Sequence, residues 1–222
     1  MSDSTELVHF ADASMYEAAP MKAEDGPKVH LLWMTPDPLG AIAAMARMYE
    51  GMPTYSLKDI TNEERRRYWR AMSETHLNAP LEAVKLHFFI EGVDRAFTHQ
   101  MVRQRTAVYA QESLRFAVKT NMAEETPCPT SYYDERVYHN ASGQNDLMDV
   151  WQNALASIEK AYKQLIASGV PAEDARGLLP QAVTTRLNYV TDLRNMLEHA
   201  GNRLCTQAQF HWRTVFMQIR EC

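Results

Sequence analysis

Two spacings of apolar residues recur along this chain, and each predicts a different kind of backbone element. The run KVHLLWMT (28–35) is short, apolar and followed by turn residues, so it predicts a strand. In AVKLHFFIEGV (83–93), apolar residues from Val84 to Ile90 alternate with polar or aromatic ones. Because successive side chains of a strand point to opposite faces, this period of two predicts a half-buried strand.

Other segments show the spacing of a helix and carry recognisable caps. Asp37 and Pro38 supply an N-cap and a proline at the first position of a helix. Thr61 and Glu64 have the spacing of a capping box at the start of NEERRRYWRAMSE, a helix with a charged face. A longer helix is predicted at about 145–168, ending at Gly169, with an inward set that consists of Leu147, Val150, Trp151, Ile158, Tyr162 and Leu165.

Two more helices are predicted to close the chain, near 188–200 and 205–219, separated by Gly201-Asn202. The first of them has an apolar stripe that predicts core packing, formed by Tyr189, Leu193 and Leu197.

The balance of these elements predicts an α+β fold, in which helices pack around a small mixed or antiparallel sheet. No Pro/Gly/Ser-rich linker divides the 222 residues, so a single domain is predicted over 27–222. Residues 1–26 are polar and aperiodic, and they predict a flexible N-terminal arm.

Composition narrows the possible partners. The net charge of −5 and the pI near 5.9 speak against nucleic acid or an anionic membrane as a partner. Cys128, Cys205 and Cys222 are far apart and form no CxxC pair, so neither disulfides nor a zinc site is expected, and no metal is predicted. The start, MSDSTELVHFADAS, lacks the features of a signal peptide, and no run reaches the ~18 apolar residues of a membrane span. A cytoplasmic protein with reduced thiols is expected.

The candidate chemistry begins at RQRTAVYAQESLR (103–115), a stretch rich in arginine. A helix is predicted to run into it, because Val93, Phe97 and Met101 lie at i, i+4 and i+8. Gln100 and Arg103 are three residues apart and would share a face of that helix.

Local charge distinguishes this stretch from the rest of the chain. Residues 94–116 contain four arginines and two acids, a charge of +2 (4 − 2) in an acidic protein. Guanidinium groups bind phosphate through two parallel hydrogen bonds. Nearby amide and hydroxyl groups can contact a base or a ribose, and the stretch and its flank supply the amides of Gln100 and Gln111 and the hydroxyl of Ser113. The mixture suits a nucleotide. The alternative is a solvent-facing segment whose arginines pair with Glu112 or Asp94, and spacing alone leaves both open.

A second group of candidates lies in the C-terminal third. Arg194 and Glu198 are at i, i+4, which is the spacing of an exposed ion pair. Arg203 follows the Gly-Asn pair, where an arginine can point into a cleft or can merely cap helix carbonyls.

These residues resemble a known family. Arg103-Gln104-Arg105, seven further residues and Ser113 are similar to the RHR-x7-S signature of the flavin-dependent thymidylate synthases. The resemblance spans about residues 28–213 and includes KVHLLWMTPDP, HLNAPLE (76–82), IEGVDRAFTHQMVRQRTAVYAQESLRF and ARGLLP…TR…LR…NR…QAQ (175–209). Several motifs in the same order are far more specific than one short pattern.

The resemblance implies an activity, cofactors and an assembly. Members of the family are methyltransferases that convert dUMP to dTMP, with methylenetetrahydrofolate as carbon donor and NADPH as reductant through bound FAD. They are homotetramers whose active sites are shared between subunits. Arg203 would be catalytic, because a cation at the N3 edge of the pyrimidine stabilises the negative charge that develops there.

The resemblance also assigns binding residues by position. Those implied for dUMP are Gln100, Arg103, Gln111, Glu112, Ser113, Leu114, Arg115, Arg176 and Arg203. Those implied for FAD are His76, Arg103, Gln104, Arg105, Asp192, Leu193, Arg194, Glu198 and Gln207.

The chain departs from the family pattern at four of these positions. Gln104 and Gln207 replace histidines, and Asp192 and Glu198 replace asparagines. An amide keeps hydrogen-bonding capacity but does not titrate near neutral pH as an imidazole does. Two alternatives therefore stay open: an enzyme that adds another one-carbon unit, such as hydroxymethyl, to a deoxypyrimidine monophosphate, and a non-catalytic nucleotide-binding relative.

Overall fold

The computed structural model describes residues 16–17, 26–75, 77–126, 144–205 and 208–222. The chain folds as two compact units. The sheet unit consists of residues 25–111 and 184–222, and the long-helix unit consists of residues 1–24 and 112–183. The arm at 1–26 and the domain boundary at 27 stay predictions.

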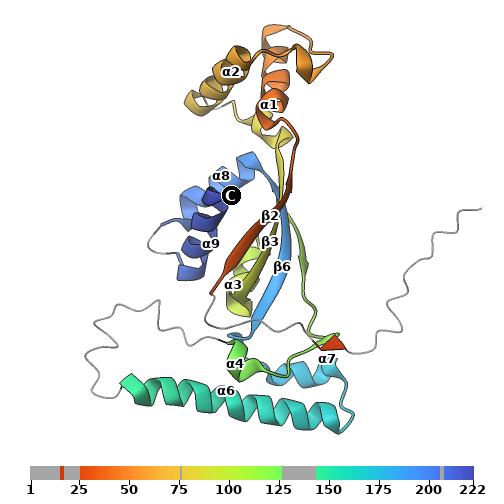
Figure 1. Cartoon of the computed structure of the whole chain (residues 1–222), viewed down its shortest axis with the longest axis vertical. Helices are drawn as coiled ribbons and strands as arrows, with labels where there is room; N and C mark the ends of the chain where they lie inside the picture. The colour runs from red at the N-terminus through yellow and green to blue at the C-terminus, as the bar shows by residue number, and fades with distance from the viewer. Residues whose placement is uncertain (1–15, 18–25, 76, 127–143, 206–207) are drawn as a thin grey trace, which may run out of the picture. The chain divides into compact units, whose positions relative to one another are not determined.

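An antiparallel sheet of four strands forms the centre of the sheet unit, with the order β2-β3-β6-β4 (Figure 1). The strands are β2 (Lys28–Met34), β3 (Lys85–Asp94), β6 (Thr184–Asp192) and β4 (Val108–Gln111). The strand predicted at 28–35 and the strand predicted at 83–93 are therefore confirmed within one or two residues. The β2–β3 pairing has a register shift between Leu31 and Trp33, which is a β-bulge in an edge strand.

Three helices pack against this sheet and share one core with it. They are α3 (Arg95–Met101), α8 (Leu193–Arg203) and α9 (Phe210–Glu221), and α8 and α9 lie side by side in Figure 1. The buried core combines Phe88, Ile90, Val93, Phe97, Met101, Leu187, Tyr189, Met196, Trp212, Val215 and Phe216. The predicted α+β class, with helices around a small antiparallel sheet, is confirmed.

Strand β6 takes the place of the first five residues, 188–192, of the helix predicted near 188–200, whereas 193–200 are confirmed as part of α8. In TTRLNYVTD, every second residue from Thr185 onward is buried, and threonine and valine favour a strand. Helix α8 begins only at Leu193, where the Asp192 side chain accepts a hydrogen bond from the backbone N–H of Asn195 at 3.0 Å. The predicted stripe is therefore only partly right. Tyr189 is a core residue and Leu193 packs against a buried cluster, but Tyr189 belongs to the strand and Leu197 is 50% exposed.

Three helix ends also differ from the predictions, and one of them is the start of the helix predicted near 205–219, which is α9 and begins only at Phe210. Gly201-Asn202 is not a stop, because α8 continues through both residues to Arg203. Helix α3 starts after Val93, at an N-cap in which Asp94 accepts from the N–H of Phe97 at 2.6 Å. It ends at Met101, two residues before the first arginine of the candidate stretch, so it does not run into that stretch.

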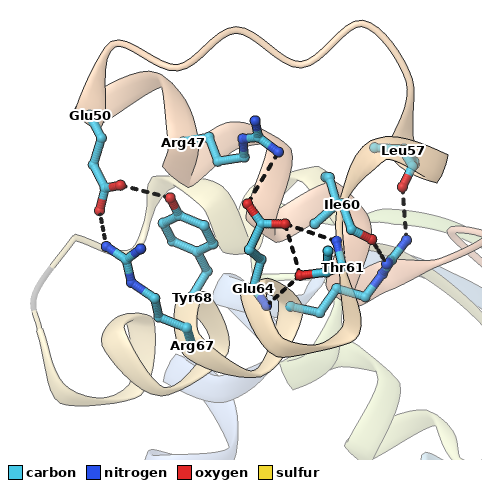
Figure 2. Close-up of polar contacts among 9 residues, drawn as sticks. Arg47, Glu50, Leu57, Ile60, Thr61, Glu64, Arg67 and Tyr68 are labelled. Carbon is cyan, nitrogen blue, oxygen red and sulfur yellow. Dashed lines mark hydrogen bonds and ion pairs between the residues drawn. The ribbon is translucent and has the colours of Figure 1, made fainter.

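A pair of helices, α1 (Pro38–Arg47) and α2 (Asn62–Glu74), precedes β3 in the sheet unit. Both predicted caps are confirmed: Asp37 accepts from the N–H of Gly40, and Thr61 and Glu64 form the capping box. Figure 2 shows the polar network on these helices, in which Glu64 contacts both Thr61 and Arg47. Short 3-10 turns lie beside the pair, at Met48–Glu50, Leu57–Asp59 and Ala79–Ala83.

The long-helix unit is built on α6 (Gln144–Ala167), which confirms the helix predicted at 145–168. Gly169 follows it with φ +83° and donates to the carbonyl of Ile166 at 3.0 Å, so the predicted stop is also confirmed. The unit contains β1 (Tyr16–Glu17) paired in parallel with β5 (Ala117–Val118), together with α4 (Met122–Glu125), α7 (Ala172–Ala175) and a 3-10 turn at Arg176–Leu178.

The inward set predicted for α6 is only partly right. Tyr162 is fully buried, and Trp151, Ile158 and Leu165 pack against buried residues of the unit. Val150 is 65% exposed, so its prediction was wrong, and Leu155 is buried in its place. The side chain of Leu147 lies outside the described part of the chain.

None of the helices among the described residues is long and apolar enough to cross a membrane.

Candidate active site

In the turn after α3, the signature residues Arg103, Gln104 and Arg105 differ in exposure. Gln104 is buried, and its Oε1 accepts from the hydroxyl of Tyr109 at 3.1 Å and from that of Tyr189 at 3.2 Å. Arg103 and Arg105 are exposed, and neither forms an ion pair with another residue that the structure describes. The buried amide thus fixes the turn from inside while the two guanidinium groups stay available to a ligand.

The two tyrosines behind Gln104 are suited to hold it. Their rings stack with centroids 5.4 Å apart, in paired strands β4 and β6. Burial raises the pKa of Tyr189 to about 12, and burial, followed by the neighbouring Tyr189, raises the pKa of Tyr109. Both hydroxyls therefore stay protonated near neutral pH and act as donors to Gln104.

A second cluster joins Gln100 of α3 to Arg203 of α8 through Trp212 of α9. The Trp212 ring is fully buried, and its Nε1 donates to Gln100 Oε1 at 3.1 Å. The Arg203 guanidinium carbon lies 4.5 Å from the centroid of the same ring, within the range of a cation–π contact. Gln100 Nε2 in turn donates to Gln209. Two residues predicted for dUMP are thus brought together, although they are far apart in sequence.

A cavity of about 480 Å³ lies between the end of α2, the segment after it and α8. Its lining includes Trp69, Met72 and Leu81 as apolar surface, together with the charged side chains of Arg194 and Glu198. Arg194 contacts Glu82 at 2.6 Å and Glu198 at 3.1 Å, so the predicted ion pair is confirmed and extended by a second acid. These two carboxylates raise the pKa of Arg194, which stays charged.

The remaining residues predicted for FAD have other surroundings. Asp192 is buried, caps α8 and contacts Lys85 at 3.2 Å, so its charge is already balanced. Leu193 lines a separate apolar cavity of about 360 Å³ against β2, β3 and α9. His76 and Gln207 lie outside the described residues, although Thr75 and Asn78 on either side of position 76 line the 480 Å³ cavity.

The long-helix unit gathers most of the other residues predicted for dUMP. Arg115 contacts the Glu173 carboxylate at 2.9 Å, and Arg176 Nε donates to the backbone carbonyl of Glu173 at 3.1 Å. One acidic residue therefore holds both arginines. Ser113 Oγ accepts from the N–H of Arg115 at 3.3 Å, and Leu114 is a buried core residue.

Glu112, the first residue of this loop, has a buried partner. Lys119 Nζ contacts both oxygens of its carboxylate, at 3.2 and 3.0 Å, and the lysine side chain is only 1% exposed. Gln111, which belongs to the sheet unit, donates through Nε2 to Thr98 at 2.9 Å and to Thr185 at 3.4 Å. The amide of Gln111 and the carboxylate of Glu112 are thus engaged by protein groups.

Sequence reasoning missed the residues that support these side chains. In the sequence, Trp212 is one of several apolar positions of the last predicted helix and carries no further signal. Lys119 belongs to no periodic pattern. No group of three or more potential metal ligands occurs within the described ranges.

Arg103 just after α3 and Arg203 at the end of α8 are cations suited to an anionic group such as a phosphate, and a cavity with apolar and charged walls lies in the same unit. Residues 30–222 match the family described as thymidylate synthase complementing protein, and the chain belongs to this family.

Three relatives illustrate the similarity, and each is named flavin-dependent thymidylate synthase. The protein of Pyrococcus abyssi is 32% identical, and the alignment covers 87% of this chain and 78% of the relative. That of Pyrococcus furiosus is 34% identical over the same shares of the two chains, 87% and 78%. That of Geobacter sulfurreducens is 30% identical over 86% of this chain and 80% of the relative.

Proposed function

We propose that this chain is a flavin-dependent thymidylate synthase that methylates dUMP to dTMP, with methylenetetrahydrofolate as carbon donor and NADPH as reductant. The observation that carries the proposal is the setting of Arg203. Its guanidinium lies on an aromatic face and forms no ion pair within the described residues, so its charge is available to a ligand.

The chemistry needs such a cation. Attack of C5 of uracil on an electrophilic carbon requires a ring rich in electrons, and negative charge then develops at the N3 edge. Arg203 stabilises that charge without a covalent bond, and Gln100, held beside the same tryptophan, supplies an amide for the base. Arg103 contributes a second guanidinium.

Phosphate binding falls to the loop of the long-helix unit in this proposal. Arg115 and Arg176 are both held by Glu173, and Ser113 adds a hydroxyl to the same loop. Gln111, Glu112 and Leu114 contribute through the backbone, since their side chains are engaged or buried.

The residues of the sheet unit fit FAD as the cofactor. The 480 Å³ cavity offers Trp69 as an aromatic wall and Arg194 as a cation, and the exposed Arg103 and Arg105 can neutralise a diphosphate. Gln104, Asp192, Leu193 and Glu198 would support that site, together with His76 and Gln207. When bound, FAD supplies the reducing equivalents that originate in NADPH.

The assembly and location belong to the same proposal. We expect a cytoplasmic homotetramer with shared active sites, and the charge of −5 supports the absence of a nucleic acid or membrane partner.

The direct test is to load the purified protein with FAD and to supply dUMP, methylenetetrahydrofolate and NADPH. A product with the mass of dTMP is expected, and so is rescue of a thymidine-auxotrophic bacterium. A hydroxymethyl product would replace this proposal with the related one-carbon transfer. Protein that binds dUMP but neither FAD nor folate would identify a non-catalytic nucleotide-binding relative.

A further inference from the structure

Trp212 contacts two residues of the proposed dUMP site through two different parts of its indole ring. The edge of the ring donates Nε1–H to Gln100 Oε1 at 3.1 Å, and the face lies 4.5 Å from the Arg203 guanidinium carbon. Gln100 belongs to α3, Arg203 to α8 and Trp212 to α9. A single side chain therefore links the ends of three helices.

The ring is itself fixed in place. Phe97 lies at 4.7 Å between ring centroids in a tilted arrangement, and Phe216 lies at 5.7 Å. Trp212 has no exposed surface, so its ring cannot change rotamer without opening the core.

An aromatic support has an electrostatic consequence that a carboxylate support lacks. A carboxylate would neutralise Arg203, whereas the face of an indole orients the guanidinium and leaves its net charge intact. The neighbouring His199, one turn earlier on α8, adds no competing charge, because burial and the Arg203 charge lower its pKa. Arg203 is thus the cation that this cluster presents.

The hydrogen bond to Gln100 has a separate effect. An amide can present either its oxygen or its NH₂ group to a ligand, and the indole N–H binds only the oxygen. Trp212 therefore holds the oxygen of Gln100 against the ring and turns its NH₂ group away from the ring, where it donates to Gln209 and to the carbonyl of Ala96.

We propose that Trp212 is a positioning residue that holds Arg203 and Gln100 in one fixed geometry, so that both act together on the uracil ring. This inference rests on the proposed function.

Two substitutions separate its contributions. Trp212→Phe keeps an aromatic face but removes the N–H, so KM for dUMP should rise several-fold while kcat changes little. Trp212→Leu removes both contacts, so kcat should fall on the order of 10-fold and KM should also rise. Ile90→Ala is the matched control, because it loses buried apolar packing in the same core, on strand β3, but is not one of the rings that hold Trp212 and leaves the contacts to Arg203 and Gln100 in place. Its kcat and KM should stay within about twofold of wild type for a similar fall in Tm.

Fluorescence gives a readout that does not depend on turnover. Titration of dUMP into the FAD-loaded enzyme should change the tryptophan emission, and this change should be lost in Trp212→Phe. It should persist in Trp33→Phe, which alters an exposed tryptophan of β2.

The possible failures are distinguishable. If Trp212→Leu and Ile90→Ala lose equal activity at equal Tm, the positioning role is refuted and the proposed function stands. If the wild-type enzyme does not bind dUMP at all, the proposed function fails and this inference fails with it.

Discussion

Arg203 of the sheet unit and Arg115 of the long-helix unit, two candidate ligand-binding arginines, differ in whether a carboxylate contacts them. In the sheet unit, Arg203 rests on the face of a buried tryptophan. In the long-helix unit, Arg115 is paired with a carboxylate, and the loop that carries it is anchored by the buried pair of Glu112 and Lys119. Aromatic support leaves the charge of an arginine available, whereas ionic support shares that charge with the protein. The first arrangement suits a group that must act on a substrate, and the second suits a loop that must be rigid.

The largest effect is expected from breaking the ionic anchor. Lys119→Met removes the lysine partner of a nearly buried carboxylate, and such losses cost about 3–5 kcal/mol of folding free energy. Urea unfolding measures the loss. The double variant Lys119→Met with Glu112→Gln should recover part of the stability, because the carboxylate charge is then gone. A single variant as stable as wild type would show that the pair does not anchor the loop.

The second-largest effect is expected from removal of Arg203, and it should lower activity instead of stability. Arg203→Ala should lower kcat by about 10²–10³-fold, the usual cost of one preorganised donor at a developing charge. Tm should change little, because the side chain is partly exposed. Arg220→Ala, an exposed arginine of α9, is the control. Activity retained in Arg203→Ala would contradict the assigned role.

The buried amide of the signature turn should contribute less. Gln104→Leu leaves the hydroxyls of Tyr109 and Tyr189 without their acceptor, which costs about 1–3 kcal/mol of stability. Gln104→His keeps an acceptor nitrogen and should cost less. Thermal unfolding of both variants, with FAD affinity measured in parallel, tests whether the amide supports the turn. Equal stability of Gln104→Leu and wild type would argue against it.

The same tyrosines predict a dependence of stability on pH. The pKa of Tyr189 is about 12 in the folded protein and ~10 in an unfolded chain, so the folded state retains this proton to higher pH. Its contribution to stability is complete below pH ~10 and is lost as the pH rises toward 12. Urea unfolding at several pH values should show that Tyr189→Phe loses less stability at alkaline pH than wild type does. An identical loss in the two proteins would exclude Tyr189 as its source.

The smallest effect concerns the exposed pair of Arg115 and Glu173. Both side chains are about half exposed, at 53% and 50%, so Glu173→Gln should cost less than ~1 kcal/mol of stability. Loss of the competing carboxylate should tighten dUMP binding at low salt by a few-fold, and the gain should shrink at high salt. Arg176 keeps its bond to the backbone carbonyl in this variant. Weaker dUMP binding in Glu173→Gln would show that the Glu173 carboxylate positions Arg115 for dUMP more than it competes with dUMP for Arg115.

The elements that the sequence predicted well are those that local signals determine. The capping box at Thr61, the glycine stop at Gly169 and the alternation in β3 each depend on residues within a few positions. The second part of strand β6, from residue 188, was mistaken for a helix because a strand residue, Tyr189, stands at helical spacing from Leu193 and Leu197. Asp192 as an N-cap was the local signal that could have placed this boundary.

The sequence proposes the candidate site as a set of residues, whose roles stay predictions, and it does not indicate their contacts. Gln100 and Trp212 are separated by 112 positions, and nothing in the pattern of either segment indicates that they meet. The inward direction of Gln104 likewise depends on tyrosines that strands β4 and β6 bring together. Such contacts follow from tertiary pairing, which a single sequence does not encode in its local spacing.

The bulge in β2 has a consequence for how this sheet behaves toward other chains. An edge strand with Leu32, Trp33 and Met34 exposed would ordinarily invite a foreign strand to extend the sheet, which is a first step toward aggregation. The irregular register at Leu31 and Trp33 bends the strand and interrupts the even ladder that such an addition requires. At the opposite edge, β4 has only four residues and offers too short a template. Neither edge of the sheet therefore favours the addition of a strand from another molecule, although β2 still exposes apolar side chains.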